Sequence, residues 1–345
     1  MYSALGRIAL VREELRHINR GDAAARLRFP HSKRFFRDRI VFGRRSGVAY
    51  ISTSAEGVVN VHQDGGSRGQ PRTSPAARAP RTVVSTTTTS DDPTVLAARR
   101  EMQQWRLLAL EPTAMRAPDA LSDPAAVAPN GAHLAAALYR LAHMGDPDVY
   151  ASVAAAAAAL TDVREVNVDL DPHRELLTLQ ARLGNGPLLP ARALSDGTLR
   201  FLALCIISAD EHYGGVLCME EPENGIHPGR ISAMVELVRE LAVDAQDEPG
   251  LNNPLRQVLV NTHSPYFVQY QHSDDLLMAL PTTISRLGRS CVTVRLLPLA
   301  QTWRAGPKAH TVTKASIVDY LRQPPDAELV LEYPHENLEA ERVWS

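Results

Sequence analysis

Residues 214–228 read Gly-Gly-Val-Leu-Cys-Met-Glu-Glu-Pro-Glu-Asn-Gly-Ile-His-Pro, and the fold is decided by this stretch. The apolar run Val216–Met219 is too short for a buried helix and follows two glycines, so it predicts a buried parallel strand. Ligand sites in open α/β sheets lie at the carboxyl ends of strands, where Glu220 and Glu221 stand. The simpler alternative is a solvated acidic turn after a core strand, and this stretch alone leaves both open.

A second stretch lies upstream, at residues 193–204. Ser195 is a good N-cap, and Gly197 has no side chain to keep a partner away from the backbone. The following helix carries Leu199, Leu202 and Ile206 on one face. We call Ser195-Asp196-Gly197 the lip. A helix N-terminus that begins with such small residues is a ready binding site for a phosphate. An ordinary capped helix is the commoner explanation for one such motif.

The third stretch lies downstream, at residues 257–265, where a short apolar strand ends in Thr262 and His263. A lone histidine at a strand end is more often structural than catalytic. The order and spacing of the three stretches therefore carry more information than any one of them.

Together the stretches resemble the C-terminal half of the ABC-like AAA ATPases, a group that includes RecF, SMC and the OLD-type ATPases. Leu194–Thr198 looks like the signature motif Leu-Ser-Gly-Gly-Gln, from which Asp196 and Thr198 depart. Met219–Glu223 resembles Walker B followed by the catalytic glutamate, Asn224–Pro228 the D-loop, and Thr262–Ser264 the switch histidine. The resemblance is firm over roughly residues 130–280.

The resemblance implies an α/β fold, namely a partial ABC-type ATPase head. Its core sheet would be flanked by helices, with a helical lobe that bears the signature and a β-rich N-terminal arm. It also implies ATP and Mg²⁺ as cofactors. Two heads would form a homodimer or heterodimer with ATP between them. An effector protein and DNA are further possible partners, and the implied roles are DNA repair or phage defence.

The resemblance assigns each site residue a role. Glu220 would hold Mg²⁺, through water because it replaces the more usual Asp, and Glu221 would activate the attacking water. His263 would contact the γ-phosphate. The phosphate of the partner's ATP would meet Ser195, Asp196 and Gly197, while Asn224 and His227 belong to the D-loop region.

One family element, the Walker A phosphate loop, is missing from the sequence. Such a loop ends in Gly-Lys-Ser/Thr, and none of the three lysines, Lys33, Lys308 and Lys314, stands in that context. We therefore expect the 345-residue chain alone to bind Mg-ATP poorly and not to hydrolyse it. A truncated start, a split subunit and a decayed copy are three open explanations.

The sequence divides into five expected regions. They are a β-rich arm (1–61), a flexible linker or insertion (62–93), a helical lobe with a β-hairpin (94–192), the ATPase core half (193–300) and a C-terminal tail (301–345). Short strands are expected at 48–52 and 58–61, around a turn at Glu56-Gly57. Helices are expected at 95–110, with Trp105 in the core, and at 132–144 and 149–160.

Composition bounds the remaining possibilities. The hydrophobic fraction of 44% permits a sizeable core, and a net charge of −2 gives no strong global attraction to nucleic acid. Residues 1–45, however, hold twelve Arg and Lys against four Asp and Glu. This arginine-rich segment is either a solvated face, which is the commoner case, or a phosphate-tracking patch. Three scattered cysteines and no signal peptide or membrane span predict a cytoplasmic protein.

Three functions compete. The leading one is an ATPase head, and the second is a non-catalytic subunit that completes a partner's ATP site through its signature motif. The third is a metal-dependent hydrolase whose ligands would be drawn from Glu220, Glu221, Glu223, His227 and His263. The motif order fits this third function less well.

Overall fold

The computed structural model describes residues 10–43, 49–62, 70–79, 81–144, 147–286, 289–306 and 309–322. Its contacts divide the chain into a first unit, Met1–Thr262, and a second unit, His263–Ser345. The expected α/β class is confirmed. The expected region boundaries stay a prediction, and residues 63–69 of the linker and 323–345 of the tail lie outside the described residues.

The first unit begins with a small antiparallel sheet of order β1-β2-β3, formed by Ile51–Thr53, Val58–Val61 and Arg72–Pro75. The turn between β1 and β2 uses Gly57 at a φ of +75°, a conformation that glycine adopts freely. The second strand matches the one expected at 58–61, and β1 overlaps the one expected at 48–52 only over Ile51 and Ser52, while Val48 lies outside the described residues. The third lies within the segment expected to be a linker, where its pairing with β2 satisfies the backbone groups.

Short helices accompany this sheet: α1 (Ala23–Arg26), the π-helix η1 (Lys33–Arg37), α2 (Asp38–Ile40), the 3₁₀ helix η2 (Ala76–Arg78), α3 (Val83–Thr86) and α4 (Pro93–Gln103). A shared core joins the strands to the later helices through Ile51, Val59, Ala76, Val84 and Val95. The buried Glu13 accepts the N–H groups of Val83 and Val84 at 2.8 and 2.9 Å. This carboxylate thereby caps α3 from a segment seventy residues away.

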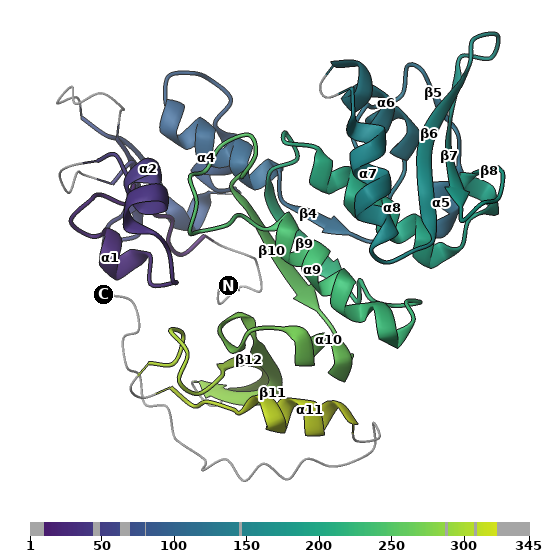
Figure 1. Cartoon of the computed structure of the whole chain (residues 1–345). Helices are drawn as coiled ribbons and strands as arrows, with labels where there is room; N and C mark the ends of the chain where they lie inside the picture. Colours follow the sequence, from purple (N-terminus) through teal and green to yellow (C-terminus); the bar gives the residue numbers. More distant parts are fainter. Residues whose placement is uncertain are drawn as a thin grey trace. The chain divides into compact units, whose positions relative to one another are not determined.

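The centre of the first unit is a parallel sheet of order β10-β9-β4. Its strands are β4 (Arg106–Leu108), β9 (Gly215–Glu220) and β10 (Arg256–Asn261), and α9 (Ile231–Leu241) connects β9 to β10 (Figure 1). A 3₁₀ turn, η4 (Pro228–Arg230), leads into α9. The strands expected around Val216 and Val258 are therefore confirmed, and they are neighbours.

The helix expected at residues 95–110 is wrong in its second half, because α4 ends at Gln103 and β4 follows. Gly215, at a φ of +82°, lies so close to Gln104 that a Cβ would come within 2.9 Å of the Gln104 carbonyl oxygen. This close approach sets β4 beside β9 and buries Leu108. Trp105 is 54% exposed, so its expected place in the core is also wrong.

A lobe of helices and antiparallel strands lies between β4 and β9 in sequence. It contains α5 (Pro112–Arg116), β5 (Asp119–Ala120), α6 (Leu134–Met144), α7 (Val149–Ala158), β6 (Val163–Asp171), β7 (Leu176–Leu183), β8 (Leu188–Pro190), the 3₁₀ turn η3 (Ala191–Ala193) and α8 (Asp196–Ala209). The strands pair in the order β5-β7-β6, with β8 also on β7. The helices expected at 132–144 and 149–160 and the β-hairpin are present.

A buried arginine closes the amino-terminal end of the parallel sheet. Arg256 is 1% exposed, and it donates from Nε to the carbonyl of Tyr213 at 2.6 Å and from Nη2 to that of Asp210 at 3.0 Å. Arg140 in turn donates to the Asp210 carboxylate at 2.5 Å. Burial lowers the pKa of Arg256. These contacts connect α6, the start of β9 and the start of β10.

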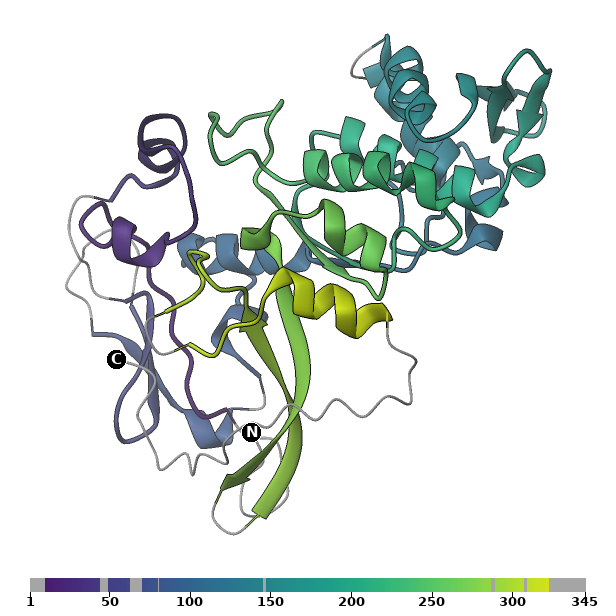
Figure 2. The same ribbon diagram turned by 60° about the horizontal axis from the view of Figure 1, so that its bottom comes forward.

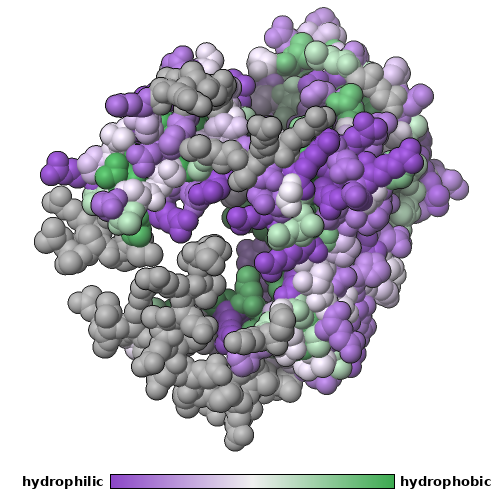
Figure 3. Space-filling model, turned by 90° about the vertical axis from the view of Figure 1, so that its left-hand side faces the viewer, coloured by the Kyte–Doolittle hydropathy of each residue, from purple (hydrophilic) through white to green (hydrophobic). Residues whose placement is uncertain are grey.

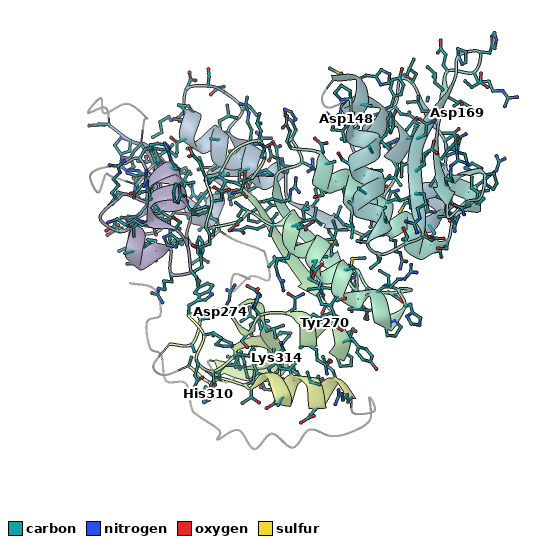
Figure 4. All side chains as sticks on the ribbon, viewed as in Figure 1. Asp148, Asp169, Tyr270, Asp274, His310 and Lys314 are labelled. Carbon is teal, nitrogen blue, oxygen red and sulfur yellow. The ribbon has the colours of Figure 1, made fainter. Side chains whose placement is uncertain are left out.

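The second unit contains α10 (Pro265–Tyr270), the 3₁₀ turn η5 (Ser273–Asp275), the hairpin β11–β12 (Leu277–Arg286 and Arg289–Pro298) and α11 (Lys314–Arg322). Figure 2 shows α11 beside this hairpin. Their common core contains Val268, Met278, Leu280, Leu297, Leu299, Ile317 and Val318. Lys314, labelled in Figure 4, donates to the carbonyls of Gln269 and Gln271 at 2.7 and 2.6 Å and so caps the end of α10.

No helix in the described part of the chain combines the length and apolar character needed to cross a bilayer. On the face drawn in Figure 3, hydrophilic residues predominate and hydrophobic ones form small separate groups.

Candidate functional site

The two central glutamates stand where the sequence places them, at the carboxyl end of β9. Glu220 is the last residue of the strand and is exposed. Glu221 is half-buried, and its N–H donates to the carbonyl of Asn261 at the end of β10, at 2.8 Å. The backbone of Glu221 has a φ of +44°, a left-handed conformation that costs energy in a residue other than glycine. Such outliers are concentrated at functional sites.

A cavity of about 410 Å³ opens beside these glutamates. It is lined by Leu107 and Leu108 at the end of β4 and the following residues Ala109–Glu111, by Arg200 and Leu204 of α8, and by Met219–Pro222 with Asn224. Three acidic residues, Glu111, Glu220 and Glu221, therefore line one cavity together with Arg200. Carboxylate oxygens of this kind are the ligands that Mg²⁺ prefers, commonly with water in the remaining positions.

Two of the lining residues, Glu111 and Arg200, were not expected from the sequence. Glu111 was missed because residues 107–110 were assigned to a helix. The apolar run before it reads equally well as a short strand, and that assignment would have placed Glu111 at a carboxyl end. Arg200 lies one helical turn into α8, and the sequence contains no signal that it meets β9.

The signature-like lip is built as a helix start. Ser195 is the N-cap of α8, and its Oγ accepts the N–H of Thr198 at 3.2 Å. The Asp196 carboxylate pairs with Arg116, which also donates to the carbonyl of Leu194 at 3.1 Å. The Ser195 hydroxyl and the Asp196 carboxylate are thus engaged within the chain itself.

The loop after β9 packs directly against this lip. A Cβ on Gly197 would lie 3.1 Å from the carbonyl oxygen of Gly225, and Arg200 donates to the carbonyl of Asn224 at 3.0 Å. The group that approaches Gly197 is therefore the chain's own backbone. The structure brings together Gly197, Asn224 and the loop that follows Glu221.

Two further residues of the loop, Glu223 and His227, have hydrogen-bond partners within the first unit. Glu223 is 7% exposed, and its Oε1 accepts the hydroxyl of Thr262. The Nδ1 of His227 accepts the N–H of Gly229 at 3.2 Å and caps η4. Among the described residues, Glu220, Glu221, Glu223 and His227 do not converge as a set of metal ligands. The metal-dependent hydrolase stays a prediction.

A group with metal-ligand chemistry occurs elsewhere in the lobe, where Asp119, Asp123 and His133 have ligand atoms within 4.8 Å of one another. Asp119 accepts the N–H of Ala136 at 3.0 Å and lies 3.1 Å from Nδ1 of His133. Asp123 accepts the N–H of Ala120 at 2.7 Å. These contacts stabilise the start of α6, and they account for the cluster without an ion.

His263, the expected switch histidine, is the first residue of the second unit and directly follows Thr262. Ser264 is the N-cap of α10 and accepts the N–H of Phe267 at 3.3 Å. The site described above is therefore composed of residues of the first unit alone, and the role of His263 stays a prediction.

One family model matches the central part of the chain. Residues 116–269 match the family described as AAA domain, putative AbiEii toxin, Type IV TA system. This match supports the expected family of nucleotide-binding AAA ATPases over most of the lobe and over β9 and β10. A search among curated proteins gave no match.

Solved SMC head structures are similar at low identity. One, from work on ATP-driven dimerization and DNA-stimulated activation of SMC ATPases, is 14% identical, with 43% of this chain and 84% of that chain covered and a TM-score of 0.29. The Pyrococcus yayanosii Smc head with a coiled coil and joint is 11% identical, with 52% of this chain and 30% of that chain covered and a TM-score of 0.32. The SMC head from Thermotoga maritima is 11% identical, with 49% of this chain and 56% of that chain covered and a TM-score of 0.27. The chain therefore spans less than two thirds of the length of the last two structures. TM-scores this low carry no argument about function.

Proposed function

We propose that this chain is an ATP-binding and ATP-hydrolysing head of an ABC/SMC-like AAA ATPase, in which hydrolysis is coupled to dimerisation of two heads. The observation that carries the proposal is the cavity lined by Glu111, Glu220 and Glu221 at the carboxyl ends of β4 and β9, next to the loop that packs on α8. The family match over residues 116–269 supports it.

The residues fit one part of a Mg-ATP site. Glu220 would hold Mg²⁺ through water, and Glu221 would orient and deprotonate the attacking water. A bound Mg²⁺ would neutralise charge on the phosphates. The lip formed by Ser195, Asp196 and Gly197 would face the phosphate of ATP held by the partner head, with Asn224 and His227 beside it and His263 near the γ-phosphate.

The residues do not provide the other part of the site. No Gly-Lys-Ser/Thr loop occurs in the sequence, and phosphoryl transfer depends chiefly on positioning and charge stabilisation. We therefore expect the phosphate cradle to come from outside these 345 residues. The second candidate function is a non-catalytic subunit that completes a partner's site through its signature motif, and the intact helix cap at Ser195 supports it.

The test compares ATP hydrolysis by the purified chain and by the complex isolated with it. We expect no turnover by the chain alone, and turnover by the complex that falls at least about a hundredfold with Glu221→Gln. Glu101→Gln, on the exposed side of α4, is the matched control and should change nothing.

Two other outcomes discriminate between the candidates. If the complex with Glu221→Gln keeps full turnover but Ser195→Arg abolishes it, the non-catalytic function is correct. Robust turnover by the pure chain would contradict the expected need for an external phosphate cradle.

The wider roles are proposals of the same kind. We propose a cytoplasmic protein that acts with an effector partner in DNA repair or phage defence. Several arginines of the N-terminal segment are already paired, since Arg37 lies 3.8 Å from Asp38 and Arg39 lies 3.2 Å from Glu248. DNA contact by this segment therefore needs a direct test, in which affinity should fall steeply with salt if the arginines meet phosphates.

A further inference from the structure

The loop that follows β9 begins in a strained conformation. Glu221 has a φ of +44°, which is unfavourable for a residue other than glycine. We call residues 221–226 the Glu221 loop. Its N–H of Asn224 donates to the carbonyl of Glu221 at 3.0 Å, and its N–H of Ile226 donates to that of Glu223 at 3.0 Å. Because a strained backbone persists only where the surrounding structure holds it, the contacts around this loop decide where the Glu221 carboxylate lies.

One side of the Glu221 loop is fixed by the end of β10. The N–H of Glu221 donates to the carbonyl of Asn261 at 2.8 Å. The buried carboxylate of Glu223 accepts the hydroxyl of Thr262. Since β10 pairs with β9 as far as Glu220, these partners belong to the sheet itself. They fix the first half of the loop.

The other side of the loop is fixed by the first turns of α8. Arg200 donates from Nη1 to the carbonyl of Asn224 at 3.0 Å. The Gly225 carbonyl oxygen lies so close to Gly197 that a Cβ on the glycine would be 3.1 Å away. The residues on both sides of Arg200 are buried, so α8 is a firm support. The arginine therefore connects the second half of the loop to a helix that the core holds in place.

Arg200 acts on the backbone of the loop. A guanidinium that donates to a carbonyl makes a charge-assisted hydrogen bond, which is stronger than a neutral one. Asn224 is joined in turn to Glu221 through its own N–H, so a restraint on Asn224 is passed back to Glu221. Arg200 also lines the cavity beside Glu221. Loss of its contact would therefore be felt at the candidate site.

We propose that Arg200 is a positioning residue for Glu221. It holds the Glu221 loop on α8 and so keeps the strained backbone of Glu221, and the carboxylate that it carries, in place at the cavity. The inference rests on the proposed function for the catalytic role of Glu221, whereas the restraint itself is a property of the chain without nucleotide. One consequence concerns regulation: a displacement of the first turn of α8 would be passed to Glu221, which connects the lip and the cavity within one chain.

The first test is hydrogen exchange of the pure, full chain without nucleotide. Arg200→Met removes the charge and the N–H donors but keeps an apolar stem. We expect the amides of Asn224 and Ile226 to exchange about tenfold faster, with β9 and α9 unchanged, because both hydrogen bonds lie within the loop. Arg192→Met, at an exposed arginine of η3, is the matched control and should leave the loop unchanged. Unchanged exchange in Arg200→Met would overturn the inference.

A second variant tests whether the strain at Glu221 is what Arg200 holds. Glycine adopts a positive φ without steric cost, so the loop of Glu221→Gly should depend less on the arginine. In the double variant, exchange of Asn224 and Ile226 should therefore stay within about threefold of that in Glu221→Gly alone. An equal acceleration by Arg200→Met in both backgrounds would mean that the arginine does not act on the conformation of Glu221.

Turnover by the complex separates positioning from a merely structural role. Arg200→Met should lower kcat about tenfold or more and leave KM for ATP within about twofold, because it displaces the Glu221 carboxylate. A normal kcat in a variant whose loop exchanges faster contradicts the inference. Turnover that survives Glu221→Gln, together with a loop opened by Arg200→Met, would contradict the proposed function and leave the restraint by Arg200 confirmed.

Discussion

Glu221 combines an acidic side chain with a backbone that favours glycine. Its φ of +44° is held by the hydrogen bond from its N–H to Asn261, at 2.8 Å. The sequence indicates the residue, since a carboxylate follows an apolar strand. It cannot indicate the conformation, because no glycine marks the position and the constraint comes from β10, forty residues away.

The first prediction uses this strain. Glu221→Gly should raise the free energy of unfolding by about 0.5–1 kcal/mol, because glycine adopts a positive φ without the steric cost. Glu220→Gly should lower it by about 0.5–1 kcal/mol, since glycine weakens a strand. Urea unfolding of the two variants checks the opposite signs. Equal destabilisation by both would contradict a left-handed Glu221.

The second prediction concerns Ser195, whose hydroxyl caps α8 whether or not it also meets a phosphate. Ser195→Ala should cost about 1 kcal/mol of stability, and Ser195→Asn should restore most of it because asparagine is an equally good N-cap. Thermal unfolding measures both. If the alanine variant keeps full stability, the hydroxyl does not act as a cap.

At the scale of secondary-structure elements, the junction of α4, β4 and β9 depends on Gly215. Its φ is +82°, and a Cβ there would come within 3.0 Å of three atoms of Gln104, two of them in the backbone. Gly215→Ala should therefore destabilise the chain by about 2–4 kcal/mol through strain and steric overlap. Gly250→Ala meets open space and should change stability by less than about 0.5 kcal/mol. Denaturant midpoints of the two variants measure the difference.

The same junction shows why some elements could be predicted and others could not. β9, β10 and α8 are marked by local signals, namely apolar runs of strand length and a Ser N-cap. β4 and β3 are three and four residues long, and their strand form depends on partners that are distant in sequence. Helical spacing predicts Trp105 in the core. Because α4 ends at Gln103, that spacing does not apply to Trp105, and its side chain is exposed.

At the scale of the whole molecule, the candidate site was predicted in part for a related reason. Glu220 and Glu221, which line the cavity, could be indicated by the sequence because their motif is local. Glu111 and Arg200 line the same cavity only because β4 pairs with β9 and α8 packs beside them. The pairing of Asp196 with Arg116, eighty residues apart, likewise arises from tertiary structure that no local pattern reports.

The last prediction tests whether the two units are separate folding entities. Leu297 is 3% exposed in a core formed by α10, α11 and the β11–β12 hairpin, all within the second unit. Leu297→Ala should lower the free energy of unfolding of that unit by about 2–4 kcal/mol, because apolar burial is lost and a cavity is left behind. Native-state hydrogen exchange should then show faster opening of β11, β12 and α11 at unchanged protection of β9.

Ala279→Gly, opposite Leu296 in the same hairpin, is the control and measures the cost of a small change in these strands. Equal loss of protection in β9 would mean that Met1–Thr262 and His263–Ser345 unfold as one cooperative body, and that the division seen in the contacts has no energetic counterpart.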